Sequence, residues 1–302
     1  MTSSVSTAAA PVRAGWAVAA ALAIVYVVWG STYLGIRFAL EGGFPPLLAV
    51  SGSRFVVAGA VLFAFLRWRG VAAPTRAHWK NLAVMGALLL LVGNGGVVLA
   101  EETVSSGLAA VAVASVPLWM GLFGAMRGQH PSHGEWLGIV VGFAGVVWLN
   151  AGGSLTATPT GLVLLLIAPI AWAYGSVWSR GRELPSPFMA AAAQMLLAGF
   201  MLMAAGLLRG ERFDSDWTVQ GALAVGYLAV FGSIIAFTAY VWLLHNVRSV
   251  LAGSYAYVNP VIAVALGAWL ANERFSAGEF GAMAVILAGV VIITLAKARR
   301  SA

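Results

Sequence analysis

Ser254-Tyr255-Ala256-Tyr257-Val258-Asn259-Pro260 occupies the middle of an apolar stretch, residues 250–270, that has about the length of one bilayer crossing. Pro260 has no N–H group, so the carbonyl of Ala256 loses the partner that a continuous helix would give it. An unsatisfied polar group in hydrocarbon costs several kcal/mol, and such a break is tolerated only against protein or a water-filled cavity. The stretch therefore predicts a broken membrane crossing that faces a cavity.

Two further prolines lie in comparable apolar settings. Pro117 lies 143 positions before Pro260, inside residues 104–126, and Pro169 lies inside residues 161–178. We expect Pro117, Pro169 and Pro260 to break their helices or to act in gating. Broken crossings at corresponding positions of two half-chains indicate the binding site of a transporter.

The composition identifies a membrane protein. Of 302 residues, 61% are hydrophobic and only 9% are charged, and the mean hydropathy is +0.91. Apolar runs long enough to span a bilayer recur along the chain. The net charge of +7 comes mostly from basic residues in short loops, which indicates membrane topology and no nucleic-acid partner. The absence of cysteine excludes disulfides and thiol catalysis.

The apolar runs predict an all-α polytopic membrane protein with ten transmembrane helices. The expected spans are residues 16–36, 47–66, 82–100, 105–126, 134–149, 161–178, 188–208, 219–243, 250–270 and 277–296. With a cytoplasmic N-terminus, the inside segments hold twelve Lys and Arg and the outside loops hold four. This asymmetry favours two cytoplasmic tails, residues 1–14 and 298–302, in a bacterial-type inner membrane.

The chain also repeats itself. Leu82-Ala83-Val84 resembles Leu223-Ala224-Val225, and Gly134-Glu135 resembles Gly278-Glu279, with offsets that fall between 139 and 145 throughout a collinear series. Residues 15–150 and 160–297 are therefore expected to form two repeats of five helices each. Because five is odd, the second repeat is inverted relative to the first. A ligand site is expected in a central cavity near the midplane, where the repeats meet.

These motifs resemble a known family. Trp29-Gly30-Ser31-Thr32-Tyr33, Arg54-Phe55, Val116-Pro117 and Asn259-Pro260, together with the paired halves, are similar to the drug/metabolite transporter superfamily. Within it, the chain resembles ten-helix exporters of amino acids and other metabolites, which carry two EamA domains. The resemblance implies a cavity that opens alternately to either side and is lined by spans 1, 3, 4, 6, 8 and 9. It also implies that spans 5 and 10 pack away from the cavity.

Two aromatic pairs are candidates for the cavity wall. Trp29 and Tyr33 are four residues apart, as are their repeat counterparts Tyr174 and Trp178, so each pair shares one helix face. Such side chains offer apolar walls with polar tips to amphipathic solutes. The alternative is helix packing or a place in the interfacial belt, where Trp and Tyr are also common.

Polar and aromatic residues near the predicted breaks complete the candidate substrate site. These residues are Asn94, Ser115, Ser233, Phe237, Tyr255, Tyr257 and Asn259. A Ser or Asn in a membrane helix also serves to bond a neighbouring helix or its own backbone, which is the alternative for Ser115 and Ser233. Phe237 is equally compatible with a place in the core.

Arg54 is the only charge placed well inside a predicted span. Intramembrane charges are functional candidates, and this one would attract a substrate carboxylate. The alternative is a structural arginine bonded to carbonyls at a helix break. The repeat counterpart is Gln194, so the repeat does not require a charge here.

Other chemistry has no support in the sequence. All ten acidic residues and all four histidines fall in loops or at span ends, which gives no metal site and no buried acid–base set for an enzyme. No phosphate-binding motif or cofactor motif is present.

We expect a secondary, non-ATP exporter of small neutral or zwitterionic metabolites, foremost aromatic or bulky neutral amino acids. The alternatives are a channel-like pore for small amphipathic solutes and a drug exporter. The expected partners are the solute and membrane lipid; the oligomeric state stays open, and a monomer is compatible with the sequence.

The lack of a midplane carboxylate leads to a first prediction. Without a proton relay or a sodium cage, an imposed pH or sodium gradient should drive little accumulation of solute. Uptake into proteoliposomes with and without each gradient measures this. Strong gradient-driven uptake would refute it.

Overall fold

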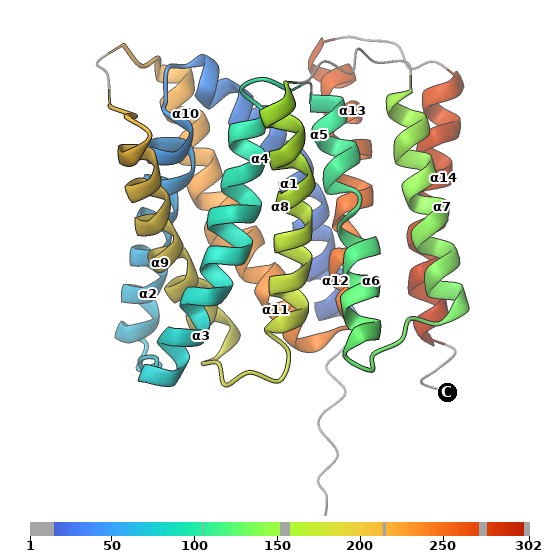
Figure 1. Cartoon of the computed structure of the whole chain (residues 1–302), viewed down its shortest axis with the longest axis horizontal. Helices are drawn as coiled ribbons and strands as arrows, with labels where there is room; N and C mark the ends of the chain where they lie inside the picture. Colours follow the sequence, from blue (N-terminus) through green and yellow to red (C-terminus); the bar gives the residue numbers. More distant parts are fainter. Residues whose placement is uncertain (1–14, 105, 152–157, 214–215, 272–276, 299–302) are drawn as a thin grey trace, which may run out of the picture.

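The computed structural model describes residues 15–104, 106–151, 158–213, 216–271 and 277–298 (Figure 1). Within these ranges every regular element is a helix, which confirms the all-α prediction for the described residues. The elements are α1 (Gly15–Glu41), the π-helical η1 (Pro46–Ser53), α2 (Arg54–Trp68), α3 (Arg76–Gly86), the π-helical η2 (Ala87–Asn94), α4 (Gly95–Ala100), α5 (Ser106–Val113), α6 (Val116–Met126), α7 (His133–Asn150), α8 (Pro159–Trp178), α9 (Pro187–Leu208), α10 (Val219–Tyr227), the π-helical η3 (Leu228–Phe237), α11 (Thr238–Asn246), α12 (Ser249–Gly253), α13 (Tyr255–Ala271) and α14 (Ala277–Ala298). Each predicted span corresponds to one of these helices or to a run of consecutive ones.

The helices suit a multi-pass membrane protein. Among the described residues, six helical runs are long and apolar enough to cross a bilayer. They are Gly15–Glu41, Pro46–Trp68, Arg76–Ala100, Pro159–Trp178, Pro187–Leu208 and Val219–Asn246. Large apolar side chains such as Val57, Leu137 and Phe200 are exposed, which suits a surface that faces lipid. Ten crossings and cytoplasmic tails stay predictions.

The helix breaks differ in position from those that the prolines predicted. The gap between α5 and α6 lies at Ala114 and Ser115, so Pro117 sits in the first turn of α6, where its missing N–H costs little. The second gap lies at Ser254, between α12 and α13, and Pro260 lies inside α13. Pro169 likewise lies inside α8. Pro169 and Pro260 therefore do not break their helices, and the second break is set by a turn at Ser254, whose Oγ donates to the Leu251 carbonyl at 2.7 Å.

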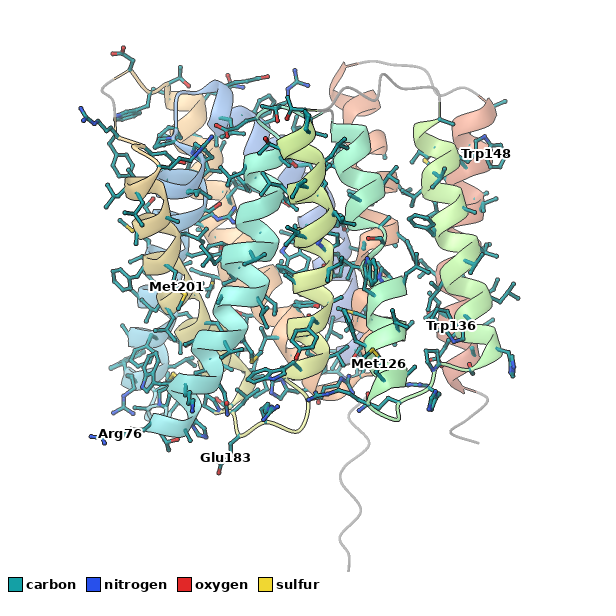
Figure 2. All side chains as sticks on the ribbon, viewed as in Figure 1. Arg76, Met126, Trp136, Trp148, Glu183 and Met201 are labelled. Atoms are coloured by element: carbon teal, nitrogen blue, oxygen red, sulfur yellow. The ribbon has the colours of Figure 1, made fainter. Side chains whose placement is uncertain are left out.

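Helices α7 and α14 pack side by side at one edge of the bundle (Figure 1). A Cβ atom on Gly289 would stand 2.5 Å from the Gly142 nitrogen, so the two backbones approach as closely as glycine permits. Trp136 and Trp148 lie near opposite ends of α7 (Figure 2), as interfacial tryptophans do. Among the described residues, neither α7 nor α14 lines the cavity described below.

This close approach makes Gly289 intolerant of a side chain. Gly289→Ala should lower the thermal stability of the purified protein, because overpacking typically costs about 1–3 kcal/mol. Gly226→Ala in α10 is the matched control, since a Cβ there meets nothing within 4 Å. If both substitutions leave the melting temperature unchanged, the glycine contact does not determine the packing of α7 on α14.

Three carboxylates lie near the ends of α4 and α9, and one of them lacks a partner. Glu102 pairs with Arg209 at 2.8 Å, and Glu211 Oε2 accepts the N–H groups of Leu47 and Leu48 at 3.0 and 2.7 Å. Glu101 follows directly after α4, and its buried Oε1 has no hydrogen-bond partner. Burial raises the pKa of Glu101 to about 8.

The raised pKa of Glu101 predicts how stability depends on pH. The folded protein holds this proton more tightly than the unfolded chain, so the free energy of unfolding should fall as pH rises from about 4.5 to about 8. Glu101→Gln should remove most of that dependence in thermal denaturation of the detergent-solubilised protein. Glu102→Gln, which removes a paired carboxylate next to it, should preserve the dependence. A pH profile that Glu101→Gln leaves unaltered would contradict the assignment.

Candidate functional site

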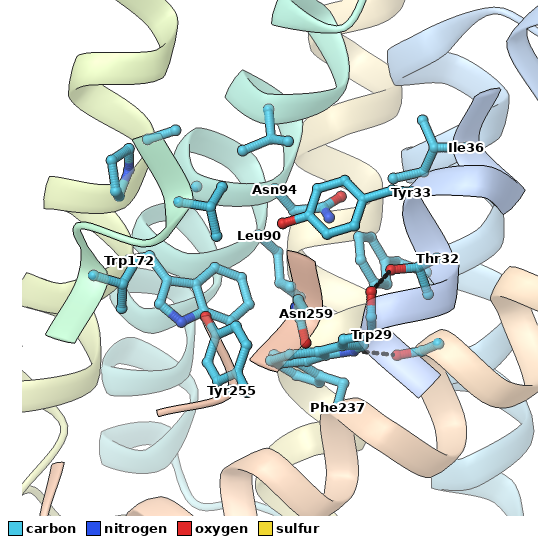
Figure 3. A pocket seen from close by; sticks show the side chains of 18 of the residues that line it. Trp29, Thr32, Tyr33, Ile36, Leu90, Asn94, Trp172, Phe237, Tyr255 and Asn259 are labelled. Carbon is cyan, nitrogen blue, oxygen red and sulfur yellow. Dashed lines mark hydrogen bonds between the residues drawn. The ribbon is translucent and has the colours of Figure 1, made fainter. Parts of the chain in front are cut away.

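A cavity lies between helices from both halves of the chain (Figure 3). It is lined by Trp29, Thr32, Tyr33, Ile36, Arg54, Phe55, Leu90, Gly93, Asn94, Val97, Val113, Val116, Ala168, Pro169, Trp172, Gly232, Phe237, Tyr255 and Asn259. The lining is mostly apolar with a few polar groups, as in small-molecule sites generally.

Trp29 stands at the centre of an aromatic cluster that forms one side of the cavity. Its ring centroid lies 4.7 Å from that of Tyr255, 5.1 Å from that of Tyr240 and 5.5 Å from that of Trp172. The rings of Trp172 and Tyr255 meet Trp29 edge to face, an arrangement that aromatic pairs prefer. The cluster thereby joins α1, α8, α11 and α13.

Hydrogen bonds fix the polar tips of this cluster. Trp29 Nε1 donates to the Gly232 carbonyl at 3.1 Å, and Trp172 Nε1 donates to the Tyr240 hydroxyl at 2.9 Å. The Tyr240 hydroxyl also bonds Ser176 Oγ at 2.7 Å. A satisfied polar network of this kind holds the rings in one arrangement.

Polar side chains from α2 and η2 form a small cluster in the cavity lining. Asn94 Oδ1 accepts Arg54 Nη2 at 3.2 Å and Ser51 Oγ at 3.3 Å. The Arg54 guanidinium lies 4.3 Å from the centroid of the Phe55 ring. Asn259 is 2% exposed, and its Oδ1 has no hydrogen-bond partner. The cavity lining thus combines aromatic walls with a buried cation and two side-chain amides.

The bundle is tied together beyond the aromatic cluster, at the end where Arg180 and Arg248 lie. Arg248 pairs with the buried carboxylate of Glu135 at 2.7 Å and donates to the His130 carbonyl at 3.1 Å. Arg180 donates to the Val247 carbonyl. Nearer the cluster, the Tyr26 hydroxyl bonds Ser254 Oγ at 2.6 Å. These contacts join loops from both halves of the chain at that end.

The structure brings seven of the predicted site residues into the cavity lining. They are Trp29, Tyr33, Asn94, Phe237, Tyr255, Asn259 and Arg54. Pro169 also lines the cavity, although it does not break its helix.

The other predicted residues lie elsewhere. Tyr174 is 45% exposed and packs on Phe123, and Trp178 stacks with Arg182 at the end of α8. Tyr257 donates to the Ile139 carbonyl of α7 at 3.0 Å. Two serines donate to nearby backbone carbonyls, Ser115 to Ala112 and Ser233 to Leu228. Pro117 and Pro260 are buried but do not line the cavity.

Sequence reasoning missed Trp172, which occupies the place expected for Tyr174. Trp29 and Trp172 are 143 positions apart, the same offset that separates Pro117 from Pro260. This shared offset is the sequence signal that identifies Trp172 as the counterpart of Trp29. Tyr174, two positions along the same helix, lies on the opposite face, because two residues rotate an α-helix by more than half a turn.

Acidic and histidine side chains do not gather in this site. In the part of the chain that the structure describes, no group of three His, Cys, Asp or Glu residues is placed to hold a metal ion. Arg54 is the one charged residue among the described lining residues. The arrangement is therefore suited to binding a solute, and we assign no chemical step to it.

Comparison with known proteins agrees with this description. Residues 16–151 and 159–295 each match the model of the EamA-like transporter family. The chain is 48% identical over 278 residues to the uncharacterized inner membrane transporter YedA of Escherichia coli K12, covering 92% of this chain and 90% of the relative. It is 23% identical to the uncharacterized transporter YvbV of Bacillus subtilis, covering 93% of each. A protein of known crystal structure shares the fold with a TM-score of 0.74 at 23% identity, covering 93% of this chain and 96% of that one. The chain belongs to the EamA-like transporter family.

Proposed function

We propose that this transporter exports small metabolites, foremost aromatic or bulky neutral amino acids, as a secondary carrier that works by alternating access. The observation that carries the proposal is the aromatic cluster around Trp29. It offers flat apolar surfaces to a solute, and it draws on helices of both halves of the chain. Aromatic and apolar walls with few polar groups are typical of sites for amphipathic small molecules.

The contacts at the Arg180 and Arg248 end support alternating access. The aromatic cluster forms one side of the cavity, and the ion pair between Arg248 and Glu135 joins the two halves at that end of the bundle. The excess of Lys and Arg in those loops supports a cytoplasmic location for that end. In this view the structure represents a state closed to the cytoplasm, with a cavity lining that extends along α1 from Trp29 to Ile36, towards the outside.

The same contacts favour a carrier over a channel-like pore. A pore needs a continuous path from one face to the other, whereas here contacts between the two halves join Trp29 to the Gly232 carbonyl and Arg248 to Glu135. To open that end, the contacts between the two halves must break. Such a change opens one end as the other closes if the halves move as units about the cavity.

Counterflow in proteoliposomes tests the proposal. Vesicles loaded with an unlabelled amino acid should accumulate the labelled one transiently, with saturation and stereoselectivity, which a pore does not show. Trp29→Ala should lower the initial rate at least about fivefold, since an aromatic contact contributes about 1 kcal/mol beyond its buried area. Asn259→Ala should also lower the rate.

Tyr174→Ala is the matched control, because it removes an aromatic side chain from the exposed face of α8. Its rate should equal that of the unaltered protein. If Trp29→Ala and Asn259→Ala transport every accepted solute at the unaltered rate, the cavity is not the transport site. Flux without trans-stimulation would favour the pore.

A further inference from the structure

Arg54 contributes a buried cation to the lining of the cavity. Its residue is 4% exposed, and it belongs to the described lining of the cavity. Among the described residues, the ion pairs formed by arginine involve Arg37, Arg209 and Arg248, and none involves Arg54. Removing a charge from water without a partner is costly, so buried charges are paired in nearly all proteins.

Most N–H donors of this guanidinium have no acceptor among the described residues. A guanidinium carries five N–H donors, and the structure shows one bond, from Nη2 to Asn94 Oδ1 at 3.2 Å. Nε is buried and has no partner. The stack on Phe55 and the bond to Asn94 fix the plane of the group. A planar group held in this way, with donors free, is suited to a carboxylate, which accepts two parallel N–H bonds.

A structural role explains these observations poorly. A structural arginine at a helix break would donate to backbone carbonyls, and among the described residues Arg54 makes no such bond. The helix junction at Arg54 has its own support, because Glu211 accepts the first N–H groups of η1 and the Arg54 N–H bonds the carbonyls of η1. The corresponding position in the second half of the chain holds Gln194 of α9, so α9 packs without a charge at that position.

We propose that Arg54 and Asn94 form a subsite for the carboxylate of the transported solute, which makes the substrates hydrophobic monocarboxylates, including zwitterionic amino acids. The inference rests on the transport function proposed above and names the substrate class of the same cavity. The apolar part of the solute lies against Trp29 and Trp172. Asn259 Oδ1, which lacks a donor, accepts the ammonium group when the solute has one.

Three matched probes separate the charges of the solute. L-Phenylalanine carries both charged groups, 3-phenylpropionate carries only the carboxylate, and phenethylamine carries only the ammonium. Calorimetric titration of the full-length protein in nanodiscs should show that both carboxylates bind at least about tenfold more tightly than the amine, because only a carboxylate can accept charge-assisted hydrogen bonds from the guanidinium. Equal affinity for L-phenylalanine and phenethylamine would overturn the proposal without any variant.

Variants then assign the preference to one side chain. Arg54→Gln should abolish the difference between carboxylate and amine, and Arg54→Lys should retain part of it. Arg37→Gln is the control, since it removes an exposed arginine of α1 that pairs with Glu41 outside the cavity. Binding of phenethylamine to Arg54→Gln reports that the variant is folded. An unchanged preference in Arg54→Gln would overturn the assignment.

An aliphatic series of probes tests the carboxylate subsite separately from the proposed preference for aromatic solutes. If no aromatic probe binds, L-leucine, 4-methylpentanoate and 3-methylbutylamine replace them. Preference for the two aliphatic carboxylates would retain the carboxylate subsite and reject the aromatic preference. Binding of phenylalanine and its amine alike would retain the aromatic cavity and reject the subsite. Failure of all six probes to bind would reject both.

Discussion

The organisation of this protein depends on the requirement that backbone polar groups in hydrocarbon find partners within the protein. Regular α-helix meets that requirement, so every departure from it needs support from side chains or neighbouring helices. The departures in this chain coincide with the cavity. Arg54 follows η1 directly, Asn94 and Phe237 end η2 and η3, and Tyr255 follows the break at Ser254. Wider π-helical turns frequently mark functional sites, and here they set the side chains that meet in the cavity.

The support for these departures comes from across the molecule. The Gly232 carbonyl, within η3, accepts the Trp29 indole N–H, which links α1 to the irregular segment and orients the ring at the centre of the aromatic cluster. The Tyr26 hydroxyl of α1 bonds Ser254 at the break before α13. One helix therefore stabilises two irregular segments of the other half. A change in the position of α1 would disturb both of them together, which couples the cavity wall at Trp29 to the helix break at Ser254.

Much of the fold follows from sequence, because hydropathy and repeat offsets report on long stretches. The helical spans and the cavity position of Trp29, Asn94 and Asn259 were accessible in this way. The finer features were not. Proline marks where an N–H is missing, but neighbours decide whether the helix breaks there, and Pro260 stays helical while the chain turns at Ser254. Helix phase is also hard to obtain, because offsets from 139 to 145 include both Trp172 and Tyr174, and only the offset of 143 shared with the proline pair favours Trp172.

Approximate symmetry in the sequence explains why a cavity forms, but the departures from symmetry determine what it holds. Trp29 and Trp172 occupy corresponding positions and meet edge to face, so the aromatic walls are shared between the halves. The charge is not shared, because Arg54 has Gln194 as its counterpart, and Gln194 is fully buried outside the cavity. A symmetric pair of cations would repel each other and would suit a symmetric dianion. A single guanidinium in a mostly apolar lining gives the cavity one charged group, and one charged group would orient an amphipathic solute in one direction.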